Sequence, residues 1–208
     1  MEEKLSVEET TQRLYMKLAE AIGWKYLKSK RCLKKCMHDL VFQIDFHSSK
    51  WNCSYQSVEV NAEFVLWCKS YGKVRCNNVI AHMSYQPDGG YWYDISDEGK
   101  LTAVFEELRT KIQNTAVCLY TEFEKDVLVA TEGLLRDHFD SYNVQLDFVA
   151  DKLGRSAIKE KAHEIYESLS DQMKQQVVEY RNGSRDKAWM INRGNLKYIV
   201  DNDLIEKE

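Results

Sequence analysis

The chain has 208 residues, of which 44% are hydrophobic and 12% aromatic, and its formal net charge is −4. A chain of this length can bury a sizeable core without disulfides, and its modest negative charge excludes a general affinity for nucleic acid or anionic membranes. The sequence contains a single proline, which favours long uninterrupted elements over proline-rich linkers.

The sequence contains no targeting signal that we can identify. Residues 1–5 have neither a cationic start followed by an apolar run nor a transit-peptide pattern. No window reaches the roughly 18 consecutive apolar residues of a membrane helix. We therefore expect a cytoplasmic protein without a membrane partner. The six cysteines are scattered along the chain, which predicts reduced thiols rather than a disulfide framework.

A helix is predicted over residues 6–22. Ser6 and Glu9 have the spacing of a capping box, in which the serine side chain accepts from a backbone N–H and the glutamate reaches back to the cap. Apolar residues recur at helical spacing up to Ile22, and Gly23 can adopt the left-handed conformation that ends a helix. The apolar stripe predicts packing against the strands that follow.

The segment from Trp24 to Cys36 is basic and contains no acidic residue. A short strand is predicted over residues 24–30, and lysines on such an edge strand discourage sheet-to-sheet aggregation. The alternative is a contact surface for nucleic acid or another acidic partner, with Trp24 and Tyr26 available for base stacking. The basic residues are Lys25, Lys28, Lys30, Arg31, Lys34 and Lys35.

Alternation of apolar and polar residues predicts an antiparallel sheet in the next part of the chain. A polar connection over residues 48–54 suits a hairpin. The sequence from Pro87 to Gly90 is a strong turn signal, because proline presets the first turn dihedral and glycine accepts positive φ. Sequential strands joined in this way form a meander. The alternating segments span residues 38–47, 55–69, 78–86 and 91–96.

The alternation sorts the side chains of this sheet onto two faces. The buried face should carry Leu40, Phe42, Ile44, Val58, Val60, Phe64 and Leu66, with Cys68 as a core thiol. The opposite, polar face should collect Asp39, Gln43, Asp45, His47, Glu59, Asn61, Glu63 and His82, with Val65, Trp67 and Trp92 adding apolar area. A tight register between the two long strands would place Asp39 near Glu63 and Gln43 near Glu59.

Helical spacing replaces the alternation after Asp97, and Ser96 or Asp97 can cap the helix that follows. The apolar stripe of this helix runs from Leu101 to Phe123. Further helices are predicted over residues 126–138, 143–153, 157–181, 185–193 and 195–206.

Strands followed by helices are the α+β pattern. The predicted fold is an N-terminal helix, an antiparallel β-meander of four to five strands, and a mostly helical C-terminal half. We expect an α+β domain over residues 1–125 and a helical region over residues 126–208.

No catalytic or cofactor motif is present, since the chain lacks a phosphate-binding loop, G-x-G-x-x-G, G-x-S-x-G and C-x-x-C. We therefore predict no cofactor and no catalytic residue. Cys32, Cys36, His38 and Cys53 are zinc-ligand types that could approach one another. However, Cys32 and Cys36 have the spacing of a helical turn and not of a paired-cysteine knuckle, so no metal site is predicted.

The carboxylates Asp39, Asp45, Glu59 and Glu63 could support acid–base chemistry only if burial or a nearby like charge raised a pKa. A solvated sheet face explains the same set without chemistry. A protein-binding face and a catalytic site are the two alternatives.

Four short stretches carry a family resemblance: Gly23-Trp24-Lys25-Tyr26, Asp39-Leu40-Val41-Phe42-Gln43-Ile44, Ser48-Ser49-Lys50-Trp51-Asn52 and Val58-Glu59-Val60-Asn61-Ala62. Together they resemble a bacterial domain family of unknown function (DUF4304-like), over roughly residues 8–120. The resemblance implies a helix, a glycine-aromatic step, a basic strand and a β-meander with a serine-asparagine hairpin. It implies no site residues.

The leading hypothesis is a non-catalytic protein that holds a protein partner on the polar sheet face or in a cleft between sheet and helices, because aromatic anchors are common at interfaces. The candidate partner surface consists of Gln43, Asp45, Glu59, Asn61, Glu63, Trp67, His82 and Trp92. Nucleic-acid binding through residues 24–36 is the second hypothesis. An enzyme with carboxylate and histidine acid–base residues is the third.

Overall fold

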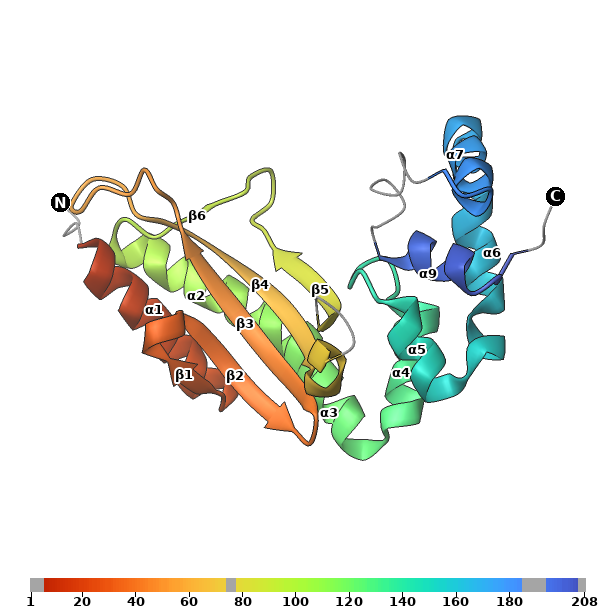
Figure 1. The fold of residues 1–208 in the computed structure, drawn as a ribbon. Coiled ribbons are helices and arrows are strands. Elements are labelled where there is room, and N and C mark those ends of the chain that lie inside the picture. Colours follow the sequence, from red (N-terminus) through yellow and green to blue (C-terminus); the bar gives the residue numbers. More distant parts are fainter. Residues whose placement is uncertain (1–5, 74–77, 185–193, 206–208) are drawn as a thin grey trace. The chain divides into compact units, whose positions relative to one another are not determined.

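The computed structural model of the chain describes residues 6–73, 78–184 and 194–205. An N-terminal helix, an antiparallel sheet and a mostly helical C-terminal half follow one another (Figure 1), which confirms the predicted α+β fold. The chain separates into two compact units, the first comprising Met1–Val127 with Ser141–Asn143 and the second Leu128–Asp140 with Val144–Glu208. The division into domains at residues 125 and 126 stays a prediction.

Helix α1 spans Val7–Ile22, as the capping signals predict. The Ser6 side chain accepts a hydrogen bond from the backbone N–H of Glu9 and so satisfies one of the free donors at the helix start. Gly23 ends the helix in the left-handed conformation, with φ of 69°. A larger side chain would strain the backbone at this position.

The sheet is a meander of antiparallel strands in the order β1-β2-β3-β4-β5, and β6 pairs with β4. The strands are β1 (Lys25–Leu27), β2 (Cys32–Met37), β3 (Leu40–Ser48), β4 (Glu59–Cys68), β5 (Val79–Tyr85) and β6 (Tyr93–Asp94). The sequence prediction missed β2 because this segment lacks the alternation of apolar and polar residues. Cys32 and Leu33 are consecutive buried residues, and two lysines follow them. A short 3₁₀ helix, η1 (Lys28–Lys30), joins β1 to β2.

The register between β3 and β4 differs from the predicted one. Pairing begins at Ser48 and Val60 and places Asp45 opposite Glu63, whereas Asp39 lies outside β3. The reason is the longer connection over residues 49–58, where the Asn52 side chain donates to the carbonyl of Glu59 and accepts from its N–H. This folded loop, rather than a tight hairpin turn, decides which residues face each other across the strands.

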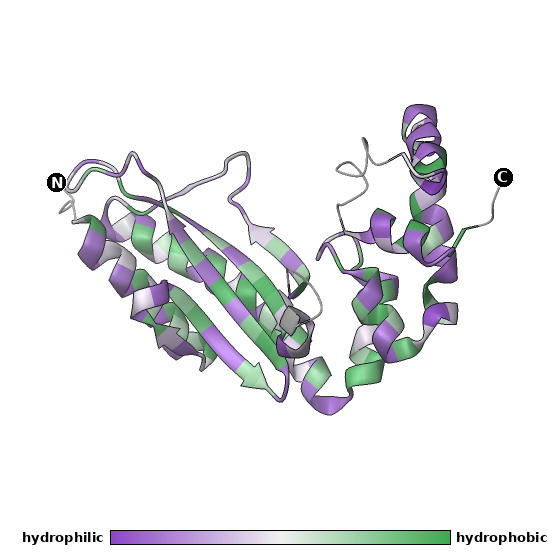
Figure 2. Cartoon of the chain, viewed as in Figure 1, coloured by the Kyte–Doolittle hydropathy of each residue, from purple (hydrophilic) through white to green (hydrophobic). Residues whose placement is uncertain are grey.

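A long helix covers the apolar face of the sheet. It consists of α2 (Glu98–Ile112), a π-helical turn (Gln113–Val117) and α3 (Cys118–Lys125). The ring of Phe123 lies 5.7 Å from that of Phe42 on β3, and α1 packs beside α2. All the predicted core residues, including Cys68, are buried. Figure 2 shows hydrophobic and hydrophilic residues alternating along the strands.

The helices that follow are α4 (Val127–Asp137), α5 (Leu146–Leu153), α6 (Lys159–Glu167), α7 (Asp171–Arg181) and α9 (Asn195–Asp201), with a 3₁₀ turn at Arg155–Ile158. The prediction of one helix over 157–181 was wrong, because Ser170 caps a new helix by accepting from the N–H of Met173.

The helix predicted over residues 185–193 lies outside the described residues. Among the described residues, no helix combines the length and the apolar character needed to cross a membrane.

Candidate functional site

Two rows of side chains cross the polar face of the sheet, the face opposite the helices. The strand registers place Cys32, Asp45, Glu63 and Ser84 in one row, and Lys34, Gln43, Val65 and His82 in the next. Cross-strand neighbours in such rows have their Cβ atoms about 4.5–5.5 Å apart. The pairing of the strands therefore brings acidic residues and histidines from three strands together at the centre of this face.

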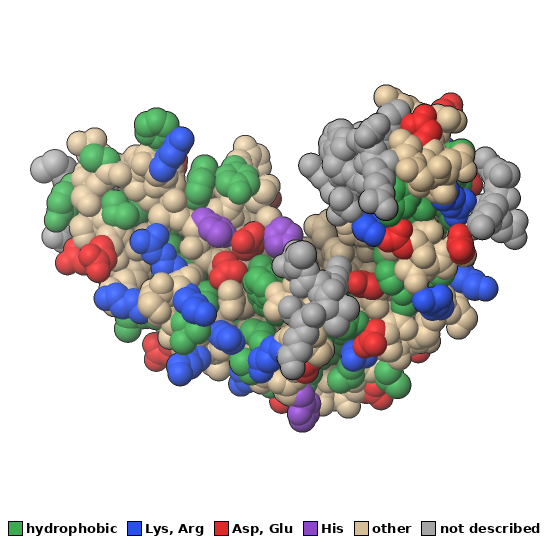
Figure 3. Space-filling view, in the orientation of Figure 1, with side chains coloured by type: hydrophobic (Ala, Val, Ile, Leu, Met, Phe, Trp, Pro, Cys, Tyr) green, Lys and Arg blue, Asp and Glu red, His purple; other side chains and the backbone are tan. Residues whose placement is uncertain are grey.

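Glu63 lies between two histidines. One carboxylate oxygen is 2.8 Å from Nε2 of His47 and the other is 2.8 Å from Nε2 of His82. Because an ionised carboxylate only accepts hydrogen bonds, Nε2 carries the proton in both rings. The side chains are 52% (His47), 37% (His82) and 28% (Glu63) exposed. In Figure 3, histidine and acidic side chains gather on the face shown.

Asp45 lies directly opposite Glu63 across β3 and β4. Burial raises the pKa of Asp45, the Gln43 amide opposes this by donating to Oδ1 at 2.7 Å, and the charge of Glu63 raises the pKa further. Burial would also raise the pKa of Glu63, but the hydrogen bonds from His82 and His47 hold it below its ordinary value of 4.5. The polar face thus holds two adjacent carboxylates. The histidines stabilise the charged form of Glu63, whereas burial and the charge of Glu63 disfavour the charged form of Asp45.

Aromatic residues lie on either side of the carboxylates along the polar face. Trp67 is half-buried on the same face of β4, and its indole N–H is buried without a hydrogen-bond partner among the described residues. Tyr91 is 55% exposed and its ring meets that of Trp92 edge-on at 5.2 Å. The Asn61 amide donates to the carbonyl of Tyr91 at 3.1 Å, which anchors the segment between β5 and β6 to the polar face.

The structure brings together Gln43, Asp45, Glu63 and His82 of the candidate partner surface. Glu59 lies further along β4, opposite Asp94 of β6. Asn61 lies on the same face as Glu63, as predicted. Asn61 is buried and bonded to the loop, so it offers little surface to a partner.

Asp39, predicted to lie on the polar face, occupies the turn before β3. There its side chain accepts from the backbone N–H of Ser70 and from the Cys68 thiol. The Ser70 side chain, followed by the Cys68 thiol, lowers its pKa.

His47 is the residue whose role the sequence prediction missed. It was assigned to the polar face but not to the candidate surface. The signal was present, because Asp45 and His47 are two residues apart on one strand and must share a face. Its contact with Glu63 depends on the register of β3 against β4. The tight hairpin that we predicted gives a different register, in which the two residues do not meet.

The basic segment does not form one surface. Lys25 and Lys34 face each other on β1 and β2, whereas Lys35 pairs with Phe42 and its ammonium lies over the Tyr120 ring at 5.4 Å. Lys28, Lys30 and Arg31 lie in and directly after η1. Trp24 is 5% exposed, because its ring packs on those of Phe42 and Tyr120. It is therefore not available for base stacking.

The four candidate zinc ligands do not converge on one site. Cys32 is buried on β2, Cys36 is exposed on the same strand, and Cys53 lies in the connection between β3 and β4. Burial raises the pKa of the Cys32 thiol. The five cysteines within the described ranges are free thiols. Within those ranges, no group of three or more His, Cys, Asp or Glu side chains could hold a metal ion.

The chain matches no family model, no curated protein and no solved structure. The resemblance to a bacterial domain family of unknown function therefore stays a prediction. The geometry of the polar face is the basis for assigning a function.

Proposed function

We propose that the chain is a non-catalytic binding protein that holds a protein partner on the polar face of its sheet, where Asp45 and Glu63 receive a cationic side chain of that partner. The observation that carries the proposal is the direct cross-strand pairing of these two carboxylates, partly exposed and flanked by His47 and His82.

Two like charges directly opposite each other destabilise a sheet, by an amount in the range of about 0.2–1 kcal/mol for cross-strand pairs. A face that only has to be solvated gains nothing from this arrangement. A partner cation offsets it, because unit charges about 4 Å apart near a protein surface attract by about 4 kcal/mol before desolvation is counted. The carboxylate pair is thus better suited to a bound cation than to water.

The aromatic residues on and around the polar face support a protein partner. Tryptophan, tyrosine and arginine are the side chains that most often anchor interfaces. Trp67 leaves its indole N–H without an acceptor among the described residues, and Tyr91 and Trp92 lie at the same end of β4 as Asn61. Aromatic faces also attract cations. An arginine or lysine of the partner is therefore the group that this surface fits best.

Affinity capture tests the proposal. The tagged chain, its Glu63→Lys variant and its Glu106→Lys variant are each incubated with an extract of the organism that carries the sequence. Glu106 is an exposed residue on α2 whose ion pair with Arg109 lies away from the polar face. The proposal expects a protein that the wild type and Glu106→Lys retain and Glu63→Lys loses. A partner retained equally by all three would contradict it.

Acid–base catalysis is the second candidate, and the Glu63 geometry favours it specifically. One carboxylate orients two imidazoles, which leaves Nδ1 of His47 and of His82 as bases when the rings are neutral. Hydrolysis of p-nitrophenyl acetate and bis(p-nitrophenyl) phosphate by the wild type and by His82→Asn tests it. A rate that depends on His82 and on pH supports catalysis, and rates equal to that of buffer argue against it.

A further inference from the structure

A hollow of about 660 Å³ lies between the start of α1, η1 and the end of β3. Its wall includes Thr11, Tyr15, Lys28, Ser29, Arg31 and Ser48. A neighbouring hollow of about 540 Å³ is lined by residues of α1, β1 and η1 and shares Gln12, Tyr26 and Lys28 with the first. The first hollow is rich in hydroxyl and cationic groups, and the second has a mainly apolar wall.

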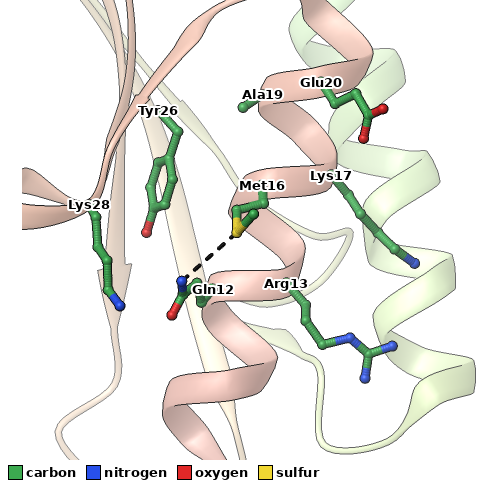
Figure 4. A pocket seen from close by; sticks show the side chains of 8 residues that line it. All are labelled: Gln12, Arg13, Met16, Lys17, Ala19, Glu20, Tyr26 and Lys28. Carbon is green, nitrogen blue, oxygen red and sulfur yellow. Dashed lines mark hydrogen bonds between the residues drawn. The ribbon is translucent and has the colours of Figure 1, made fainter.

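The second hollow is drawn in Figure 4. Tyr26 and Lys28 lie across from Gln12 and Met16 of α1, while Lys17 and Glu20 point away from Tyr26. The charges of this wall are largely engaged elsewhere, since Arg13 forms an ion pair with Glu98 and the Lys17 ammonium lies over the Phe105 ring. The apolar surface left for a ligand consists of the Tyr26 ring and the side chain of Met16, which is 53% exposed and whose sulfur accepts from the Gln12 amide at 3.8 Å.

Tyr15 contributes an unsatisfied donor to the first hollow. The residue is 1% exposed, its ring is stacked on Phe46 at 4.0 Å, and its hydroxyl oxygen is buried without a hydrogen-bond partner among the described residues. Burial raises its pKa to about 12, whereas the Ser48 side chain, which lies close to the hydroxyl but outside the geometry of a full hydrogen bond, and the charge of Arg31 lower it. The hydroxyl therefore stays protonated and can donate to an acceptor that enters the hollow.

Arg31 supplies positive charge to the first hollow, and hydrogen bonds fix the position of its main chain. Its φ is 49°, its N–H donates to the carbonyl of Lys28 at 3.2 Å, and its own carbonyl accepts from the N–H of Phe46 at 3.0 Å. No ion pair of Arg31 occurs within the part of the chain that the structure describes. Lys28 forms an ion pair with Glu8, whose Oε1 lies 3.9 Å from Nζ. Among the described residues, the wall of this hollow thus carries two cations, a buried hydroxyl and one carboxylate, that of Glu8.

We infer that the two hollows form one binding site for a small organic oxyanion, a carboxylate or phosphate monoester with an apolar body. Arg31, Lys28 and the Tyr15 hydroxyl hold the oxyanion, and Tyr26 and Met16 contact the apolar body. Guanidinium groups suit planar or multidentate oxygen acceptors, and hydrogen bonds between charged groups are the strong ones. The site gives a role to part of the basic segment, and it uses no residue of the carboxylate pair on the polar face.

Calorimetric titration of the whole chain with four probes tests the site. Phenyl phosphate and phenylacetate carry both halves of the ligand, inorganic phosphate carries the anion alone, and benzyl alcohol carries the ring alone. One or both of the first two should bind, and the last two should bind at least about tenfold more weakly. Benzyl alcohol binding as well as the anions would overturn the oxyanion assignment, and inorganic phosphate binding as well as phenyl phosphate would overturn the apolar contact. No binding of either two-part probe at millimolar concentration would overturn the site.

Variants locate the binding. Arg31→Gln should weaken the affinity by about tenfold or more, whereas the control Lys30→Gln, a neighbouring exposed lysine that lines neither hollow, should leave it unchanged. Tyr15→Phe keeps the stacked ring and removes only the hydroxyl, so it should fold and bind several-fold more weakly. Affinities of Arg31→Gln and Tyr15→Phe equal to the wild type would overturn the assignment. If Arg31→Gln does not fold, the Tyr15→Phe result alone decides.

Discussion

Replacing Asp45 with asparagine should make the first unit more stable at neutral pH. The change keeps the size of the side chain and the oxygen that accepts from Gln43, but it removes the negative charge opposite Glu63. Burial and Glu63 both raise the pKa of Asp45. The folded chain therefore holds the proton of Asp45 more tightly than the unfolded chain does, and the ionised carboxylate costs stability.

The size of the gain follows from the cross-strand geometry. A like-charged pair directly opposite on a sheet is unfavourable by about 0.2–1 kcal/mol, so Asp45→Asn should raise the free energy of unfolding by a similar amount. For an acid whose folded pKa is raised, the cost is present above the folded pKa and disappears as the pH falls below the unfolded value. The gain should therefore be full at pH 7 and shrink as the pH approaches 3.8.

Urea unfolding of the wild type and Asp45→Asn at several pH values measures this gain. Asp137→Asn is the matched control, because Arg136 lowers the pKa of that exposed carboxyl and its removal brings no gain. A loss of stability in Asp45→Asn at pH 7, or a gain that does not change with pH, would refute the reasoning. The same variant should bind the protein partner more weakly, since it removes half of the proposed cation site.

Three further changes test the site and the fold. Glu63→Gln should lower stability by about 0.2–1 kcal/mol at pH 7. The folded pKa of Glu63 lies below 4.5, so the loss measured by urea unfolding should be complete above pH 4.5. The loss should disappear as the pH falls through the folded pKa. A loss that does not depend on pH would be inconsistent with the histidine contacts. Gly23→Ala should cost about 1 kcal/mol, because φ of 69° disfavours a Cβ; an unchanged melting temperature would speak against that geometry. Phe42→Ala should cost about 3–5 kcal/mol in urea unfolding, and a loss below about 1 kcal/mol would contradict its place in the core.

Local signals in the sequence were enough to predict several elements. Ser6, Glu9 and Gly23 mark the two ends of α1, because helix caps depend on neighbouring residues only. The two-residue period of β3 and β4 also predicted the buried face, since it does not depend on which residues lie opposite each other. These features are determined within one element at a time.

Most of the features that failed depend on contacts between distant residues. The register of β3 against β4 is decided by the Asn52 hydrogen bonds to Glu59, and the sequence alone does not show how residues 49–58 fold. The carboxylate pair, and the contact of Glu63 with His47, follow from that register. The burial of Trp24 follows from the tertiary packing of α3. The break before α7 had a local signal, Ser170 followed by an acidic residue, that the prediction of one helix overlooked.

Site-specific photocross-linking tests the binding face most directly. Benzoylphenylalanine is placed at Gln43, on the polar face, or at Thr121, an exposed position on α3, and each protein is irradiated with the captured partner. The account predicts that the partner is cross-linked through position 43, that position 121 gives little product, and that Glu63→Lys abolishes the product at position 43. Equal cross-linking at the two positions, or none at position 43, would contradict it.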